Sequence, residues 1–317
     1  MSLAAFDLGG TKLAMAVFNR AGEILFHKIV NLEKRRGSEV AQLITNSFRL
    51  ISIGARLAGN EIESIGICVP GIYSSKTGSV WAPNIAGWED YPLLAEIKKV
   101  SGKIPITIDN DRACCILGEL WKGNAQKCKD AIFLAVGTGI GAGILINGNV
   151  LRGSKDIAGA IGWMALDAPF KEEYIQCGCF EHYASGEGIA KLAKRFLSEE
   201  KNYSGELNNK SLKEITCHEV FKAYENKDEI AEKVINICIQ FWGMATANLV
   251  SLFNPEKIIF GGGVFGPAVS LIPKIKEEAT KWSQPVSIQQ VSFEVSRLGT
   301  NAAVYGAGFL AFSNLHS

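Results

Sequence analysis

The sequence predicts an α/β protein in which a strand–turn–strand–turn–strand unit occurs twice. The first copy lies at the N-terminus, where the apolar residues 3–5 and 13–18 flank a glycine turn and residues 24–26 form a third apolar run. The second copy begins about 130 residues later, with the apolar run 131–136, another glycine turn and the apolar run 144–146. Two copies at so long a period indicate a duplicated sheet rather than a solenoid.

The first glycine turn, Asp7-Leu8-Gly9-Gly10-Thr11-Lys12, predicts a phosphate-binding site. Glycine tolerates positive φ and has no side chain to block a ligand, so the backbone N–H groups of such a turn can face phosphate oxygens. Asp7, at the end of the first strand, can hold a hydrated Mg²⁺ ion beside phosphates. An ordinary hairpin turn is the alternative for this segment taken alone.

The second glycine turn, Gly137-Thr138-Gly139-Ile140-Gly141-Ala142-Gly143, also fits the loose dinucleotide pattern GxGxxG/A, with Asp156 near the expected acidic position. That pattern needs a helix directly after the glycines. Here Gly143 and Asn147-Gly148 interrupt a stretch rich in Ile and Leu, which predicts a hairpin instead. The usual P-loop pattern, GxxxxGK followed by Ser or Thr, does not occur in the sequence.

A third glycine run follows a long predicted helix. Apolar residues at helical spacing between Asp228 and Phe253 predict this helix, which ends before Pro255. The strand 257–260 then leads into Gly261-Gly262-Gly263, where bare backbone can receive a ribose or a flat ring.

Two further regions complete the chain. Gly299-Thr300-Asn301 opens a helix of small residues, in which Gly306 and Gly308 permit close packing. Residues 198–227 are polar and weakly patterned, which predicts a surface insertion with short helical pieces.

The catalytic candidate is Asp111. The segment 103–108 predicts a short strand, Asp109-Asn110-Asp111 follows it directly, and a helix is expected over 112–121. Asp111 is thus expected at or near a helix N-terminus, where the helix dipole favours an ionised carboxylate. An ionised carboxylate can remove the proton of a hydroxyl that attacks phosphorus. The alternative is that Asp109 or Asp111 only caps the helix.

Composition excludes several classes of protein. The chain has 317 residues, enough for two domains, and its 33 Lys and Arg balance its 32 Asp and Glu. That balance indicates no general nucleic-acid or membrane surface. No signal peptide and no uncharged apolar stretch of membrane-spanning length is recognisable, so a cytoplasmic protein is expected. The eight scattered cysteines are therefore expected to be reduced thiols.

In combination these segments resemble the ROK family of sugar kinases, within the actin-like and hexokinase-like ATPase fold, which is ribonuclease H-like. Asp7 to Lys12 is similar to the family's first phosphate motif, Gly137 to Gly143 to the second, and Phe260 to Gly263 to the adenosine segment. The resemblance covers nearly the whole chain and implies two α/β lobes with a duplicated mixed-sheet core and a cleft between them. It assigns residues 1–111 and 300–317 to the small lobe, and 112–299 to the large one.

The resemblance also implies which residues bind a sugar. Asn110 and Asp111 match the family's substrate-binding Asn and catalytic Asp. Gly71, in Val69-Pro70-Gly71, and Asn84, in the segment 83–88, match positions that line the sugar site. Glu181 lies in the segment 178–186, which matches a family segment whose Glu contacts the sugar.

The chain departs from the family pattern at two places. Ala160 and Trp163 stand where the family has a Glu and a His that bind hydroxyls on the C1–C2 side of the sugar. Trp163 is expected either to stack on the sugar or an acyl substituent, or to fill core volume. The other departure is the zinc loop, which keeps only Cys179 because Glu172 and Tyr174 replace two cysteines. Since zinc prefers four N or S ligands, no family-type zinc is expected. The alternative to the absence of metal is a different site formed by Cys177, Cys179 and His182.

The resemblance implies ATP-dependent phosphorylation of a hexose or amino-hexose, as in glucokinases, N-acetylglucosamine or N-acetylmannosamine kinases, or fructokinases, with ATP and Mg²⁺ bound and Asp111 as general base. The alternative is a sugar-sensing regulator without catalytic activity, which the loss of the Glu and His favours. Retention of Asp7, Asp111 and three glycine segments favours the kinase. Family repressors carry an N-terminal helix-turn-helix, for which a phosphate motif at Asp7 leaves no room, so no nucleic-acid or membrane partner is expected. A homo-oligomer, such as a dimer, is expected.

Overall fold

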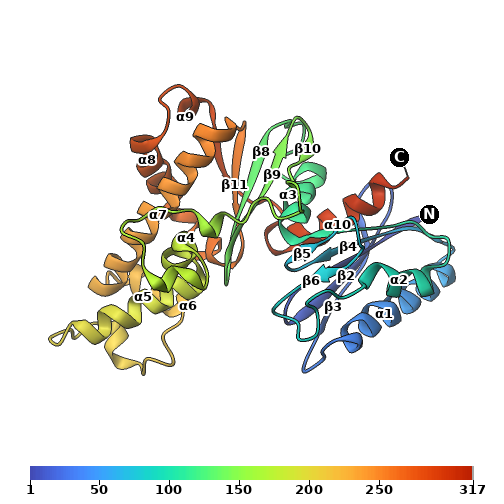
Figure 1. Ribbon diagram of the computed structural model, residues 1–317, viewed down its shortest axis with the longest axis horizontal. Coiled ribbons are helices and arrows are strands. Elements are labelled where there is room, and N and C mark those ends of the chain that lie inside the picture. The colour runs from blue at the N-terminus through green and yellow to red at the C-terminus, as the bar shows by residue number, and fades with distance from the viewer. Residues whose placement is uncertain (316–317) are drawn as a thin grey trace. The chain divides into compact units, whose positions relative to one another are not determined.

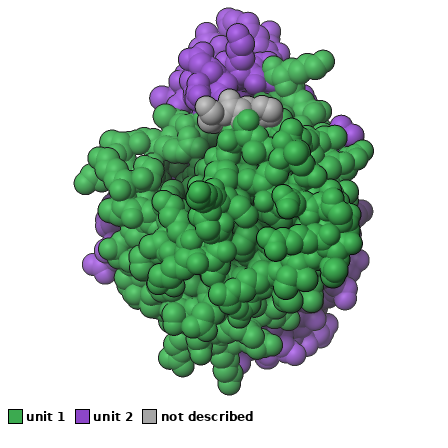
Figure 2. All heavy atoms as spheres, turned by 90° about the vertical axis from the view of Figure 1, so that its right-hand side faces the viewer, with its two compact units in different colours: residues 1–127, 150–158, 300–317 green, residues 128–149, 159–299 purple. Residues whose placement is uncertain are grey.

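A computed structural model of the chain describes residues 1–315 and divides into two compact units (Figures 1 and 2). The first unit comprises residues 1–127, 150–158 and the C-terminal residues from 300 on, and the second comprises 128–149 and 159–299. The expected division placed all of 112–299 in one lobe. The contacts instead group 112–127 and 150–158 with the first unit.

The first unit contains a five-stranded sheet with the order β3-β2-β1-β4-β7. Its strands are β1 (Ser2–Leu8), β2 (Lys12–Phe18), β3 (Ile24–Asn31), β4 (Ile62–Val69) and β7 (Ile106–Asn110). The first three strands form the antiparallel meander expected from the sequence, and β4 and β7 add to β1 in parallel. A separate short hairpin joins β5 (Ile72–Tyr73) and β6 (Val80–Trp81). Because β1, β4 and β7 are parallel, their carboxyl ends meet at one edge of the sheet.

Helices cover both faces of β1 and its neighbours in this sheet, whereas the edge strand β3 is exposed. The helices are α1 (Ser38–Leu57), α2 (Leu93–Ser101), α3 (Asp111–Lys122) and α10 (Ala302–Ser313). Successive β1 residues alternate between two clusters, as the pleat requires. Ala4 and Phe6 pack with residues of α1 and α2, whereas Leu3 and Ala5 pack with residues of α3 and α10. The run of apolar residues in β1 therefore reflects a strand covered on both sides.

The second unit repeats the same plan. Its sheet has the order β10-β9-β8-β11-β12, formed by β8 (Ala131–Val136), β9 (Ile140–Ile146), β10 (Asn149–Val150), β11 (Lys257–Gly261) and β12 (Ser292–Val295). β8 and β9 form an antiparallel hairpin, and β11 and β12 are added in parallel. Asn147 and Gly148 turn the chain into β10 with φ of 51° and 76°, which suits a tight hairpin turn. The expected duplication of the sheet is confirmed.

The remaining elements of the second unit cover its sheet and connect its strands. The α-helices are α4 (Cys179–Ala184), α5 (Gly186–Glu199), α6 (Cys217–Glu225), α7 (Glu229–Phe253), α8 (Ile272–Trp282) and α9 (Ser287–Gln290). Short 3₁₀ turns are η1 (Ile161–Trp163), η2 (Glu172–Ile175), η3 (Glu206–Asn209), η4 (Gly263–Phe265) and η5 (Pro267–Leu271), and η6 (Gly299–Asn301) leads into α10.

α7 is the central helix of the second unit. The Asp228 carboxylate caps it by accepting hydrogen bonds from the backbone N–H groups of Ile230 and Ala231, both at 3.0 Å. The helix ends at Phe253, where Asn254 turns left-handed with φ 43° ahead of Pro255. By length and composition alone α7 could cross a membrane, but 67% of its most apolar window is buried inside the protein. That burial is typical of a core helix.

The region 198–227 is more than a surface insertion, which corrects the expectation. Tyr203, Leu207 and Phe221 are buried in the main core of the second unit. The region forms η3 and α6, so the expected short helical pieces are present. Its weak pattern reflects single apolar residues that reach the core from short, irregular segments.

Close packing of α3 against α10 depends on glycines at the contact. A Cβ on Gly306 would overlap the carbonyl of Cys114, and one on Gly118 would overlap the carbonyl of Ala302. We therefore predict that Gly306→Ala destabilises the protein by about 1–3 kcal/mol, the usual cost of overpacking a core.

Gly54, in the interior of α1, provides the matched control. A Cβ there would meet nothing within 4 Å, so Gly54→Ala should stabilise the protein by about 0.5–1 kcal/mol. Urea denaturation of both variants measures the two effects. Equal stability changes in the two variants would contradict the packing argument.

Candidate active site

The carboxyl edge of the first sheet gathers polar residues. Asp7 on β1 pairs in register with Cys68 on β4, and Cys68 pairs with Asp109 on β7. Residues paired across parallel strands project from the same face, so these three side chains share one side of the sheet. Asn110 and Asp111 follow directly at the same edge.

The surroundings of Asp7 disfavour the ionised form of its carboxylate. The pKa of Asp7 is raised from 3.8 to about 6, mainly by burial and in smaller part by the negative charge of Asp111. A hydrogen bond with Cys68 and the charge of Lys12 oppose this shift. A divalent cation would stabilise the ionised form, so the site suits the proposed role of Asp7 beside hydrated Mg²⁺.

The first glycine turn is a tight hairpin, but positive φ is not the reason for its glycines. Neither Gly9 nor Gly10 has a positive φ, which corrects the expected cause. The turn closes through a 2.8 Å hydrogen bond from the Gly9 N–H to the Lys12 carbonyl, and the Thr11 carbonyl accepts from Leu32. Position 10 lies close to Asn84, since a Cβ there would lie 2.7 Å from Nδ2 of Asn84 and that side chain would have to shift. The turn proposed to bind phosphate therefore lies beside a residue expected to bind the sugar.

Asn110, rather than either aspartate, caps the catalytic helix. Its side-chain Oδ1 accepts a hydrogen bond of 3.0 Å from the Ala113 N–H at the start of α3. The capping alternative for Asp109 or Asp111 is therefore wrong, since the cap position belongs to the residue between them. Asp111 is the first residue of the helix.

Asp111 presents one free carboxylate oxygen. Oδ1 accepts a 2.8 Å hydrogen bond from the Arg112 N–H and lies 3.9 Å from Nε of Arg112. Within residues 1–315 no other residue is recorded as a hydrogen-bond donor to Oδ2, and 51% of the side-chain surface is open to solvent. Desolvation nevertheless raises the pKa of Asp111, while Arg112 lowers it. The net direction is opposite to the effect expected from the helix dipole alone, because burial outweighs it.

Arg112 is a neighbour that sequence reasoning did not single out. Its Nη2 donates to the carbonyl of Gly71 at 3.3 Å, so it joins the catalytic candidate to a segment expected to line the sugar site. Gly71 has φ 83°, and a Cβ there would overlap the carbonyl of Trp81. The glycine is thus required by both conformation and space.

In the second unit, the second glycine turn lies against Glu181. Glu181 on α4 accepts a 2.6 Å hydrogen bond from the Ile140 N–H through Oε2. A Cβ on Gly139 would lie 2.8 Å from that oxygen, so glycine at this position makes room for the carboxylate. Burial raises the pKa of Glu181, and the bond from Ile140 lowers it. Gly141 lies within β9, paired with Ala135, and the hairpin excludes the dinucleotide alternative.

The third glycine run adjoins the second turn, but its three glycines serve different purposes. Gly262, with φ 88°, packs on the backbone of Val136, and a Cβ on Gly261 would overlap the ring of Phe133. Of these three glycines only Gly263 faces open space. Gly137 in the second turn does so too. The expectation of three bare residues beneath a flat ring is therefore too broad.

Gly137, Thr138 and Gly263 line a common cavity of about 500 Å³ in the second unit. Lys194 on α5 and Lys213 ahead of α6 also line it. Open backbone beside two cations fits a phosphate-bearing ligand. The two lysines were not identified from the sequence, because they lie in segments without a recognisable motif.

Ala160 and Trp163 lie at the two ends of a turn that packs on Glu181. Ala160 precedes η1 and Trp163 is its last residue, and a Cβ on Gly162 between them would lie 2.9 Å from Oε2 of Glu181. Trp163 is 58% exposed, so the alternative that it fills vacated core volume is wrong. An exposed indole provides an apolar platform for a ligand.

The degenerate zinc loop contains a cluster of polar side chains. Tyr174, which replaces a family cysteine, is buried and donates a 2.7 Å hydrogen bond to Oδ2 of Asp167. Lys171 donates to the same oxygen at 2.8 Å and to the Tyr183 hydroxyl at 2.7 Å. The bonds from Lys171 and Tyr174 lower the pKa of Asp167 to about 2. Tyr183 lies on α4 with Glu181, so the cluster ties this loop to the helix.

The alternative metal site gains no support. Within the described residues, Cys177, Cys179 and His182 do not gather as a metal-binding group, and no other three His, Cys, Asp or Glu side chains do so. Burial lowers the pKa of His182, whose nearest carboxylate is Glu173 at 3.8 Å. The absence of bound zinc stays a prediction.

We predict that the polar cluster stabilises the loop without metal. Tyr174→Phe removes the hydroxyl that bonds both Asp167 and Tyr183, and should lower the free energy of unfolding by about 1–2 kcal/mol. The matched control is Tyr224→Phe, which removes an exposed contact with Lys274 and should change stability little. EDTA should leave the melting temperature of the wild type unchanged. A large drop with EDTA, or zinc at one equivalent by elemental analysis, would contradict the prediction.

We also predict that Asp7 lowers stability at neutral pH in metal-free buffer. Because folding raises its pKa from 3.8 to about 6, the ionised form destabilises the fold above pH 6, by up to about 3 kcal/mol. That cost is lost as the pH falls from 6 towards 3.8. Asp7→Asn should therefore be more stable than the wild type at pH 7.5, with a smaller gain at pH 5.

Urea denaturation in EDTA at both pH values measures the Asp7 effect. The control is Asp90→Asn, which changes an exposed carboxylate in the same unit and should give no comparable gain. If the gain for Asp7→Asn were equal at pH 5 and pH 7.5, burial of the charge would not be its cause.

Comparison with known proteins identifies the family. The model of the ROK family matches residues 3–314. A glucokinase of Halalkalibacterium halodurans is 33% identical over 312 residues, covering 96% of this chain and 93% of the relative. A xylose repressor of Caldicellulosiruptor bescii is 29% identical and covers all of this chain, which spans 79% of the repressor.

Solved structures agree in fold. A ROK family glucokinase from Streptomyces griseus, in complex with glucose and AMPPNP, superposes with a TM-score of 0.78 at 27% identity. The match covers 99% of this chain and 100% of the glucokinase. The two units with their repeated mixed sheets are thus those of the actin-like ATPase fold, and the chain belongs to the ROK family.

Proposed function

We propose that this protein phosphorylates the primary hydroxyl of a hexose or amino-hexose with ATP. The observation that carries the proposal is the arrangement at Asp111. One carboxylate oxygen is held by the backbone of Arg112, the other is free, and the capping amide of Asn110 is adjacent. A base with one fixed and one free oxygen can accept a proton from a hydroxyl in a defined direction.

The proposed sugar ligands come from both units. Gly71, Asn84 and Asn110 belong to the first unit, and Glu181 belongs to the second. Oε2 of Glu181 accepts the hydrogen bond from Ile140, and among residues 1–315 no hydrogen bond joins Oε1. Oε1 is therefore available to accept a hydrogen bond from a sugar hydroxyl. Asn110 carries a second amide hydrogen that its contact with Asp109 does not use.

The residues present also fit a nucleotide. Gly137, Thr138 and Gly263 line the cavity in which Lys194 and Lys213 supply positive charge, and Gly9 to Lys12 form the other proposed phosphate turn. Bound ATP supplies the phosphoryl group, and Asp7 would hold hydrated Mg²⁺ beside it. Asp111 removes the hydroxyl proton, while Asn84, Asn110 and Glu181 orient the sugar. With eight free thiols, the cytoplasm is the compartment we propose.

The second candidate function is a sugar-sensing regulator. Two observations favour it: Ala160 and Trp163 replace polar sugar ligands of the family, and a relative covering the whole chain is named a xylose repressor. The buried carboxylate of Asp7 argues for the kinase. A protein that only binds sugar has no use for a charge that destabilises the fold. Self-association as a dimer remains a prediction for either function.

Replacement of the general base tests the kinase. We predict that Asp111→Asn lowers kcat by about 10²–10⁴-fold, because an amide cannot accept the proton, while ATP binding persists. ADP release, measured over a panel of glucose, mannose, fructose, N-acetylglucosamine and N-acetylmannosamine, gives the activity and the preferred sugar.

Two results would overturn parts of this proposal. Nearly full turnover by Asp111→Asn would remove that residue from the role of base. Tight sugar binding by calorimetry without ADP release from the wild type, for any sugar in the panel, would favour the regulator.

A further inference from the structure

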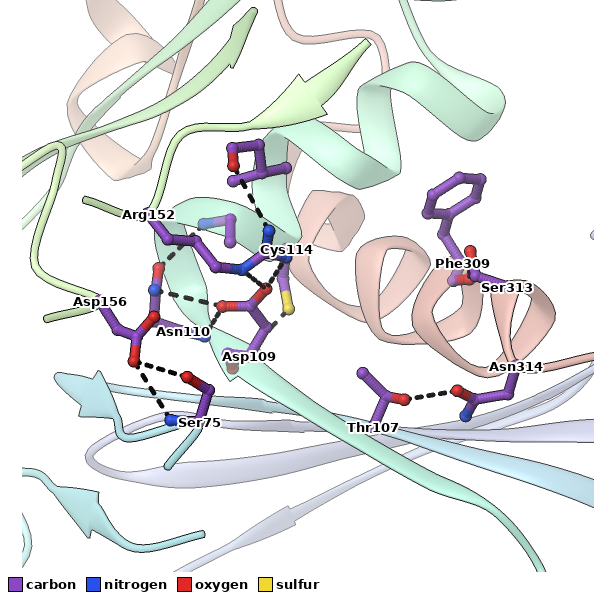
Figure 3. A network of polar contacts seen from close by, with 12 residues as sticks. Ser75, Thr107, Asp109, Asn110, Cys114, Arg152, Asp156, Phe309, Ser313 and Asn314 are labelled. Atoms are coloured by element: carbon purple, nitrogen blue, oxygen red, sulfur yellow. Dashed lines mark hydrogen bonds and ion pairs between the residues drawn. The ribbon is translucent and has the colours of Figure 1, made fainter. Parts of the chain in front are cut away.

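The segment 150–158 belongs to the first unit although the residues before and after it belong to the second. Two of its side chains attach it there (Figure 3). Arg152 binds Asp109, and Asp156 accepts hydrogen bonds from Ser75, at 3.1 Å from the backbone N–H and 3.0 Å from the hydroxyl.

The contact between Arg152 and Asp109 is buried on one side. Nε and Nη2 of Arg152 both donate to Oδ2 of Asp109, with Nε at 3.0 Å. The Asp109 side chain is 6% exposed, whereas that of Arg152 is 40% exposed. A buried carboxylate is costly unless it is paired with a cation or accepts several hydrogen bonds. Arg152 supplies both the positive charge and two donors to Asp109.

Asp109 passes this constraint to the sugar-binding amide. Its second oxygen, Oδ1, accepts hydrogen bonds from the backbone N–H of Asn110 at 2.8 Å and from Nδ2 of Asn110 at 3.3 Å. The Oδ1 atom of Asn110 is in turn engaged by the Ala113 N–H at the start of α3. The amide plane of Asn110 is thus fixed from both ends, and its remaining N–H points in a single direction.

We propose that Arg152 is a positioning residue, which through Asp109 holds the Asn110 amide in the orientation that binds the sugar and keeps Asp111 at its place on α3. This inference rests on the proposed kinase function. Among the described residues, the hydrogen bonds of Arg152 go to Asp109 and to the Val150 carbonyl, neither of which is assigned to the nucleotide, so its proposed role is confined to the sugar and the base. Figure 3 shows the guanidinium of Arg152 directed at Asp109, with Asn110 on the other side of that carboxylate.

The same segment leads into the other sugar ligands. Gly159, with φ 88°, follows Asp156 closely, and its carbonyl accepts a 2.8 Å hydrogen bond from Ala142 in the second unit. η1, beside Glu181, comes next. Asp156 itself has φ 60°, a conformation that is rare outside glycine and asparagine and that its bonds to Ser75 maintain. The contacts of Arg152 and Asp156 therefore fix the segment 150–158, from which the chain continues into Gly159 and η1.

Kinetics of Arg152→Ala and Arg152→Lys test the proposal. Loss of the guanidinium leaves Asp109 without its cation and frees the amide of Asn110. We expect kcat/KM for the sugar to fall by about 10–100-fold in Arg152→Ala, with KM for ATP unchanged, since a small misplacement of a binding group is enough for such a loss. Arg152→Lys keeps the positive charge but has only one nitrogen to donate from. Its kcat/KM for the sugar should therefore lie between the values of the wild type and of Arg152→Ala. Low millimolar guanidinium should partly restore Arg152→Ala.

The matched control is Arg20→Ala. Arg20 forms a similar two-nitrogen contact with Glu63 in the same unit, with Nε and Nη2 donating at 3.1 and 3.0 Å to one oxygen. Its loss should leave both KM values and kcat unchanged. A double variant, Asp109→Asn with Arg152→Ala, removes the buried charge together with its partner and should recover part of the sugar affinity lost in Arg152→Ala.

The outcomes separate the inference from the proposed function. A wild type without turnover on any sugar overturns the kinase. An active wild type whose Arg152→Ala variant matches Arg20→Ala in sugar KM and kcat overturns the inference alone. Equal changes in KM for ATP and for sugar, without rescue by guanidinium, also overturn it, because the effect would then not be confined to the sugar. If Arg152→Ala does not fold, Arg152→Lys decides by the same comparison.

Discussion

The candidate site depends on three carboxylates that the protein shields from water to different extents, since Asp109 is buried, Asp7 is partly buried and Asp111 is half exposed. Asp7 and Asp109 lie on one face at the carboxyl edge of a parallel sheet, and Asp111 follows on the next helix. Their negative charges are compensated in different ways. Asp109 is paired with the guanidinium of Arg152, and Asp111 accepts a hydrogen bond from the backbone of Arg112. Asp7 is compensated mainly by the Cys68 thiol, and its pKa is about 6. The least compensated of the three is the one proposed to meet a metal ion, which is the arrangement expected where function opposes stability.

Much of the fold was predictable because it repeats simple patterns. Apolar runs of strand length around glycine turns predicted both meanders, and the capped α7 was bounded by Asp228 and Pro255. The region 198–227 was misjudged because its core residues are isolated in short segments, which leave no periodic signal. Domain limits were also hard to place, since α3 packs on the distant α10 and the segment 150–158 attaches through side chains.

Candidate site residues could be proposed from the sequence only where a motif contained them. Asp111, Asn110 and Glu181 lie in recognisable segments, but Arg152, Arg112 and Lys213 do not, because a long cationic side chain can reach a site from many sequence positions. The reasons for the glycines were partly mistaken. Gly10, Gly139 and Gly261 are small because protein atoms occupy the space beside them, and this cannot be read without coordinates.

The contact between Gly10 and Asn84 couples two recognition tasks that are usually treated as separate. The amide nitrogen of Asn84 occupies the volume where residue 10 would otherwise carry a side chain. A larger side chain at position 84 would press on position 10 of the turn proposed to bind phosphate. A substitution at position 84 that is meant to change the proposed sugar preference therefore has to leave this volume free.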